Sequence, residues 1–126
     1  MLKTDVVIIG AGPTGLALAC QLIRYGIDFV IIDKKEGTTP FSRAIGVQAR
    51  TLEIYDQIGL ADDLISLGHT AEKVKFLKDG VVRGEANLSE LGVGLSPFPF
   101  VLLVEQGLHE ELLYKFITDN KQDVLW

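Results

Sequence analysis

A glycine-rich turn between two short apolar runs constrains the fold of this chain more than any other feature. Residues 4–33 read TDVVIIGAGPTGLALACQLIRYGIDFVIID, and the turn at residues 10–15 fits the pattern G-x-G-x-x-G. The β-branched apolar run before it, residues 6–9, is typical of a strand buried on both faces. A helical pattern comes next, and a second apolar run over residues 29–32 ends in Asp33. This order predicts a strand–helix–strand unit that binds a dinucleotide.

Each glycine in the turn has a physical role in the predicted dinucleotide site. Gly10 allows a tight turn off the strand, Gly12 lets the backbone approach a pyrophosphate, and Gly15 lets the helix pack closely on the strand. Pro13 lacks a backbone N–H, but at the start of a helix that N–H would have no partner within the helix. Thr14 follows it in the turn. The free N–H groups and the dipole of the helix start attract phosphate oxygens.

Asp33 stands 18 residues after Gly15, near the spacing expected of a carboxylate that binds ribose hydroxyls. The same carboxylate would repel a 2′-phosphate, which argues against NADP in this site. The alternative, a glycine-rich strand–helix turn that binds nothing, is disfavoured because strand, helix, second strand and acid all occur in the required order.

The rest of the chain predicts further helices and strands. The first helix is expected to bury Leu18, Leu22 and Tyr25, and a second helix is expected over Gly46–Ile58 with Tyr55 in the core. An alternating segment at 73–76, the turn Asp79-Gly80 and a returning strand at 81–86 predict an antiparallel hairpin. A strand over 100–104, a helix over 107–118 and a strand from Val124 follow. The predicted fold class is therefore α/β, a Rossmann-like βαβ core with an inserted antiparallel hairpin.

Composition excludes several classes of protein. The 126 residues carry a net charge of −5 and no run of Lys or Arg, so we expect no nucleic-acid partner. The single cysteine, Cys20, allows no disulfide framework and favours a reducing, cytoplasmic location. No apolar run approaches the roughly 20 residues of a membrane span, and the first strand begins too early for a signal peptide.

His69 and His109 lack partners at metal-ligand spacing, so no metal site is expected, and His109 is expected to be exposed. A final strand ending at Trp126, with sheet edges open, predicts that the chain is a piece of a longer protein.

Several segments carry a resemblance to a known family. They are residues 10–19, 42–44, 50–53 and 104–113, which read GAGPTGLALA, SRA, RTLE and VEQGLHEELL. Together they resemble the N-terminal part of the FAD-dependent aromatic hydroxylases, single-component monooxygenases of the para-hydroxybenzoate hydroxylase and phenol hydroxylase type. The first segment also occurs in many FAD and NAD proteins. Arg43 and Gln106, in their sequence contexts, are therefore the residues that point to the aromatic hydroxylases in particular.

The resemblance implies that residues 1–126 are the N-terminal part of an FAD-binding domain, with FAD bound in an extended form. The resemblance implies that Asp33 binds the adenosine ribose and that Lys34 lies beside the adenine. It also implies that Arg43 binds the pyrophosphate or the flavin side, and that Gln106 binds the ribityl chain. The implied cofactor-binding residues are Gly10, Gly12, Pro13, Thr14, Gly15, Asp33, Lys34, Arg43 and Gln106. The full-length enzyme would use NADH or NADPH to hydroxylate a small aromatic or phenolic substrate, and it could form a homodimer. No catalytic side chain or metal ligand is implied here, and the piece alone is expected to be inactive, because the later FAD motifs and the substrate pocket would follow Trp126.

Alternatives remain open from the residues themselves. Arg43 could be a solvated loop residue, Gln106 a plain helix-start residue, and Arg50 could pair with Glu53 instead of a ligand. A rival enzyme is an NAD-dependent dehydrogenase or another FAD oxidoreductase. A rival of a different class is a non-catalytic dinucleotide-binding module, because fold alone does not decide function.

Overall fold

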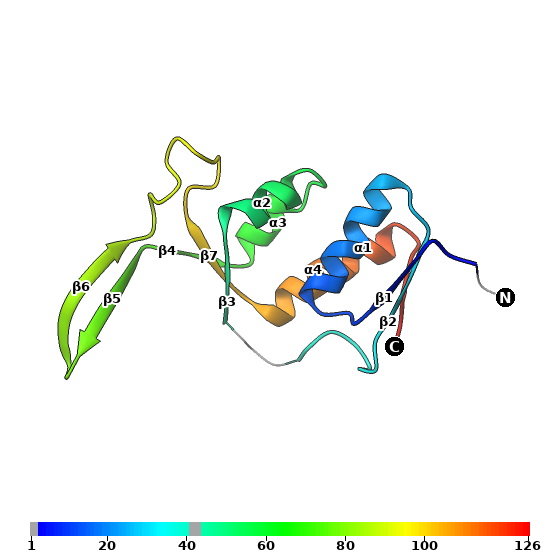
Figure 1. Ribbon diagram of the computed structural model, residues 1–126, viewed down its shortest axis with the longest axis horizontal. Helices are drawn as coiled ribbons and strands as arrows, with labels where there is room; N and C mark the ends of the chain where they lie inside the picture. The colour runs from blue at the N-terminus through cyan, green and yellow to red at the C-terminus, as the bar shows by residue number, and fades with distance from the viewer. Residues whose placement is uncertain (1–2, 41–43) are drawn as a thin grey trace. The chain divides into compact units, whose positions relative to one another are not determined.

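The computed structural model describes residues 3–40 and 44–126 of the chain (Figure 1). The chain divides into two compact units, one made of Met1–Arg43 with Glu105–Trp126 and the other of Ala44–Val104. The predicted site residues that the structure describes all lie in the first unit, whereas Arg43 lies outside the described residues.

The first unit is a three-stranded parallel sheet with two helices. Its elements are β1 (Val6–Ile9), α1 (Pro13–Tyr25), β2 (Phe29–Ile32), α4 (Gln106–Asp119) and β8 (Val124–Leu125). The strand order is β1-β2-β8, and Ile9, Ile32 and Leu125 lie in one row across the carboxyl ends. The predicted Rossmann-like βαβ core is confirmed, and the predicted last strand pairs with β2.

Helices α1 and α4 pack against each other over one face of this sheet (Figure 1). The Cys20 thiol lies 3.7 Å from the carbonyl oxygen of Leu113, which shows how closely the two helices approach. The residues that form this core are Ile8, Leu16, Ala19, Cys20, Leu22, Phe29, Ile31, Leu113, Ile117 and Val124. The core therefore consists of alternate strand residues and the helix faces that lie on them.

The opposite face of the sheet is exposed in the described part of the chain. The exposed fractions are 57% for Val7, 84% for Ile9 and 56% for Leu125. The prediction that the strand over residues 6–9 is buried on both faces is therefore wrong for this chain. The predicted helix face is also wrong in part, because Leu18 and Tyr25 are exposed. A period of 3.6 residues fits two adjacent stripes of α1, and the position of α4 selects the stripe of Leu16, Ala19, Cys20 and Leu22.

The second unit contains two helices and two small sheets. Its elements are β3 (Ala44–Val47), α2 (Ala49–Asp56), α3 (Ala61–Ser66), β4 (His69–Ala71), β5 (Lys73–Lys78), β6 (Val81–Asn87) and most of β7 (Val101–Glu105). One sheet has the order β3-β7-β4. The predicted helix over 46–58 begins later, at Ala49, because Gly46 and Val47 belong to β3. Tyr55 is buried, as predicted.

Strands β5 and β6 form an antiparallel hairpin. Its turn is Asp79-Gly80, where both residues have positive φ, 52° and 75°. Such values suit a two-residue turn whose twist matches that of the strands. Pairing shifts between Phe76 and Leu77, which marks a bulge.

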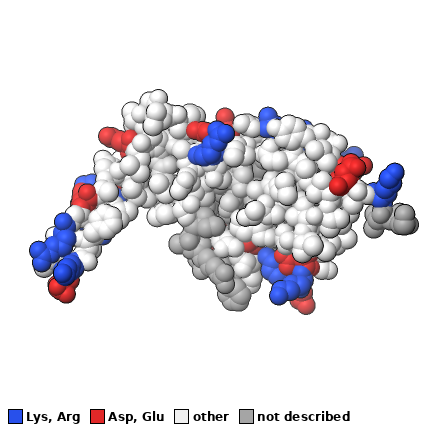
Figure 2. Space-filling view, viewed as in Figure 1, with Lys and Arg blue, Asp and Glu red and all other residues white. Residues whose placement is uncertain are grey.

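The charged residues are mixed in sign on the face of the molecule that Figure 2 shows, and no extended field of Lys and Arg covers it. Within residues 3–40 and 44–126, no helix has the length and apolar character needed to cross a membrane. The same residues contain no group of three or more His, Cys, Asp or Glu side chains placed to hold a metal ion.

Candidate dinucleotide site

The glycine turn begins at the carboxyl end of β1. The N–H of Gly10 donates to the carbonyl oxygen of Ile32 at 2.8 Å, so the turn remains attached to β2. Gly10 has a φ of +108°, a conformation that side chains with a Cβ rarely adopt. The first glycine is therefore required by the backbone of the turn itself.

The other two glycines of the motif differ from each other in their surroundings. A Cβ placed on Gly15 would lie only 1.9 Å from the carbonyl oxygen of Gly10, so this glycine permits α1 to lie against the end of β1. A Cβ placed on Gly12 would have no atom within 4 Å. Gly12 therefore faces open space, as expected of a backbone that a ligand approaches closely.

The start of α1 has the properties of an anion-binding site. Gly12 is the N-cap and Pro13 the first helical residue, and no side chain among the described residues caps the helix. The first turn also contains no acidic residue. The N–H groups of Thr14 and Gly15 have no acceptor within the helix, and the helix dipole adds partial positive charge there. This turn can therefore receive phosphate oxygens.

Asp33 ties the glycine turn to the end of β2. Its carboxylate accepts a hydrogen bond from the N–H of Ala11 at 2.6 Å and another from the N–H of Lys35 at 2.8 Å. The bond from the Lys35 N–H is the largest cause that lowers the pKa of Asp33, and the bond from Ala11 and the charges of Lys35 and Lys34 lower it further. The carboxylate is ionised at neutral pH and retains acceptor capacity beyond these two bonds.

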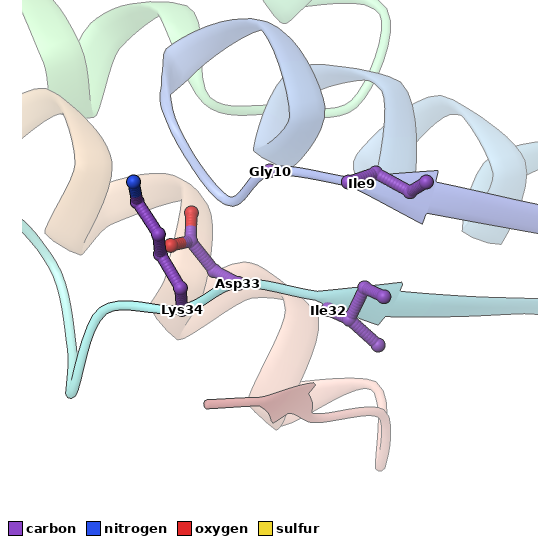
Figure 3. A pocket seen from close by; sticks show the side chains of 5 residues that line it. All are labelled: Ile9, Gly10, Ile32, Asp33 and Lys34. Atoms are coloured by element: carbon purple, nitrogen blue, oxygen red, sulfur yellow. The ribbon is translucent and has the colours of Figure 1, made fainter.

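An open pocket of about 490 Å³ lies at the ends of β1 and β2 (Figure 3). It is lined by Ile9, Gly10, Ile32, Asp33 and Lys34. In Figure 3 the side chains of Asp33 and Lys34 extend to the same side of β2, towards the turn that follows Gly10. A second hollow runs from β1 over Gly12 and the first turn of α1. Gly10 lines both hollows, so an extended ligand could pass from one to the other.

Gln106 is the first residue of α4, and it is connected to this region through a residue that sequence reasoning missed. Its side-chain Nε2 donates to Glu110 at 2.8 Å. Glu110 is fully buried and also contacts Lys35, whose Nζ donates to the carbonyl oxygen of Ala11 at 3.3 Å. The sequence signal for Glu110 is its place four residues after Gln106, on the same face of α4, whereas Lys35 has no such signal.

Two other expectations have clear outcomes. His109 is buried, not exposed, because it shares a helix row with the buried residues Leu113 and Ile117. Burial lowers the pKa of His109, and the charge of Glu110 partly opposes this. Arg50 forms an ion pair with Glu53 at 3.0 Å. This is the alternative to ligand binding that the sequence left open for Arg50.

The model of one protein family, described as the FAD binding domain, matches residues 3–123 of this chain. The chain belongs to this FAD-binding domain family. A flavin-dependent monooxygenase from Mycobacteroides abscessus is 38% identical over 126 residues, covering 94% of this chain and 26% of that protein. The 3-hydroxybenzoate 4-monooxygenase from Comamonas testosteroni is 32% identical over 117 residues, covering 88% of this chain and 18% of that protein. The resemblance to FAD-dependent monooxygenases is thus confirmed.

Solved structures of monooxygenases have the same fold as this FAD-binding domain. An anhydrotetracycline hydroxylase from Streptomyces rimosus matches with a TM-score of 0.71 and 33% identity, over 98% of this chain and 24% of that chain. A p-nitrophenol 4-monooxygenase from Pseudomonas putida matches with a TM-score of 0.86 and 21% identity, over 99% and 31%. In eight curated relatives, the matched segment spans between 14% and 26% of the length of the relative.

The described residues fit the FAD that the family implies. Gly12 leaves open space where a phosphate would approach, and the start of α1 has no side-chain cap among the residues that the structure describes. Asp33 is placed at the carboxyl end of β2, where ligands of open parallel sheets bind. The geometry of the glycine turn and the family match therefore agree.

Proposed function

We propose that this chain forms the adenosine- and pyrophosphate-binding part of the FAD-binding domain of a longer flavin-dependent monooxygenase. One observation carries the proposal: an open glycine turn, an uncapped helix start and an ionised carboxylate converge at the ends of two adjacent parallel strands. The share of the relatives' length that the chain spans supports a longer protein.

The residues of the glycine turn and the end of β2 divide the binding of FAD between them. The backbone N–H groups of Gly12, Thr14 and Gly15 bind the pyrophosphate, with Pro13 shaping the helix start. Asp33 accepts hydrogen bonds from the adenosine ribose with the acceptor capacity that Ala11 and Lys35 leave over. Lys34, at the edge of the pocket, lies beside the adenine.

Two further residues extend the proposed site towards the flavin. Gln106 binds the ribityl chain, because an amide can both donate to and accept from a polyol. Arg43, which lies outside the described residues, binds the pyrophosphate or the flavin side, since a guanidinium suits phosphate oxygens.

When bound, FAD would take electrons from NADH or NADPH and, with dioxygen, supply the chemistry that hydroxylates an aromatic small molecule. The residues of this chain hold and orient the cofactor, and we assign none of them a role as acid or base. The names of the relatives support the substrate class, as in 3-hydroxybenzoate 4-monooxygenase. A cytoplasmic location and a homodimer stay predictions that fractionation and size-exclusion chromatography would test.

The test is the absorption spectrum of the purified full-length protein, followed by chromatography of the nucleotide released on denaturation. We expect the visible bands of a flavin and the release of FAD. Bound NAD without flavin would instead identify a dehydrogenase. A protein that retains no flavin, and that binds none when titrated with FAD, would contradict the proposal.

A further inference from the structure

A fully buried carboxylate, that of Glu110, lies among three hydrogen-bond donors. Its Oε2 accepts from the backbone N–H of Thr39 at 2.7 Å and contacts the Nζ of Lys35 at 3.5 Å. Its Oε1 accepts from the Nε2 of Gln106 at 2.8 Å. Taking a carboxylate out of water is costly unless donors replace the water, and here they come from the loop after β2 and from α4 itself.

The chemistry of this group determines how the Gln106 amide is turned. The Thr39 N–H and the Lys35 ammonium can only donate, so Oε2 of Glu110 is an acceptor, and Oε1 likewise accepts from the Nε2 of Gln106. An amide that faces such an acceptor must present its NH₂ group. The carbonyl oxygen of Gln106 is then directed away from Glu110, and it is available as an acceptor for another group.

The other oxygen of Glu110 anchors the loop after β2. Thr39 lies against the start of α4 so closely that a Cβ on Gly107 would be 2.8 Å from the Thr39 carbonyl oxygen. Lys35, in the same loop, reaches both Glu110 and the carbonyl oxygen of Ala11 in the glycine turn. One buried carboxylate thus connects the first residue of α4, the loop and the turn at the carboxyl end of β1.

We propose that Glu110 is a positioning residue for the cofactor: it orients the Gln106 amide so that its carbonyl oxygen accepts from a hydroxyl of the ribityl chain. This inference rests on the proposed function, because the role of Gln106 towards FAD belongs to it. Glu110 itself does not touch the cofactor and acts through Gln106. Its burial, its three donors and its contact with Gln106 carry the inference.

Substitution of Glu110 by glutamine tests the proposal with little change in size. A glutamine at this position offers only one acceptor end. If that end keeps Thr39 and Lys35, its NH₂ group faces Gln106, and the Gln106 amide must turn its NH₂ group outward instead. We expect Glu110→Gln to weaken FAD binding about tenfold, since one acceptor bond is lost and a donor replaces it.

A double-mutant cycle separates positioning from general stability. FAD affinity is measured by quenching of flavin fluorescence, in full-length apoprotein, for Glu110→Gln, Gln106→Ala and the double variant. We expect Glu110→Gln to change the affinity little when Gln106 is already alanine, because there is then no amide to misorient. Glu111→Gln is the matched control: it removes the next carboxylate on the same helix, at an exposed position, and should bind FAD like the wild type.

Equal loss of affinity in both backgrounds, or no loss on Glu110→Gln, would overturn the inference while FAD binding by the wild type leaves the proposed function intact. Failure of the wild type to bind FAD would instead contradict the proposed function. If Glu110→Gln does not fold, NMR of the wild-type apoprotein tests the orientation of the Gln106 amide instead. One side-chain N–H of Gln106, assigned by its loss in Gln106→Ala, should exchange slowly with solvent. Rapid exchange of both N–H protons would refute the orientation.

Discussion

Replacing Gly15 by alanine is predicted to destabilise the first unit while the same change at Gly12 is not. The two glycines are three residues apart in one turn and one motif. A methyl group at Gly15 would lie 1.9 Å from the Gly10 carbonyl oxygen, 3.1 Å from its carbonyl carbon and 3.3 Å from the Cγ2 of Ile8. At Gly12, where φ is −87°, a methyl group meets no atom within 4 Å.

The magnitude follows from these distances. Because Cβ contacts under 3.0 Å are essentially never observed, α1 and the end of β1 must separate by about 1.1 Å. Overpacking costs about 1–3 kcal/mol, and the upper half applies because the obstructing atoms belong to the backbone. Alanine is favoured over glycine within a helix by about 1 kcal/mol, which offsets part of this. The free energy of unfolding should therefore fall by about 1–2 kcal/mol for Gly15→Ala.

Gly12→Ala should change the same free energy by less than about 0.5 kcal/mol, because poorer N-capping and lower unfolded-state entropy oppose each other. The assay is urea unfolding of the full-length apoprotein, followed by far-ultraviolet circular dichroism, with hydrogen exchange of the α1 amides as a local readout. Under the proposed function, Gly12→Ala should nevertheless weaken FAD binding, since the methyl group fills the space left for the pyrophosphate. Equal stability of the two variants would refute the close packing of Gly15 on Gly10.

Two further predictions concern titratable groups. The pKa of Asp33 is lowered by folding, so its contribution to stability is present above its ordinary pKa of 3.8 and is lost as the pH falls through the lower folded value. The stability difference between wild type and Asp33→Asn, measured by urea unfolding of the apoprotein, should thus shrink below about pH 4, and a constant difference down to pH 3 would contradict this. Burial raises the pKa of Cys20 to about 12, so the thiol should resist alkylation by iodoacetamide at pH 8 and react after unfolding in urea. Equal alkylation of native and unfolded protein, measured by mass spectrometry, would show that Cys20 is accessible.

Much of the glycine turn could be predicted from the sequence because its requirements are local. Gly10 needs a positive φ, Gly15 sits opposite a backbone oxygen three residues into a helix, and Asp33 directly follows a strand. Each of these demands acts within a few residues of the chain, so residue type and spacing express it. The same holds for the hairpin turn at Asp79-Gly80, where both residues adopt positive φ.

Helix faces were predicted less well, because a helical period does not say what the helix packs against. Leu18 and Tyr25 fit an apolar stripe as well as the buried residues do, yet only the stripe facing the sheet and α4 is covered. His109 was expected in water and is buried, because it shares its row with Leu113 and Ile117. These outcomes depend on which surfaces meet, and that is decided by contacts between distant segments.

The sequence by itself therefore determined the βαβ unit, the glycine turn and Asp33, since these follow from backbone conformation and residue spacing. Only the tertiary structure decided that Asp33 bonds to Ala11, that β8 pairs with β2, and that Glu110 connects the loop to Gln106. Lys35 and Glu110 are 75 residues apart in the chain. A buried carboxylate is stable only where folding gathers donors around it, and no local pattern in the sequence specifies that gathering.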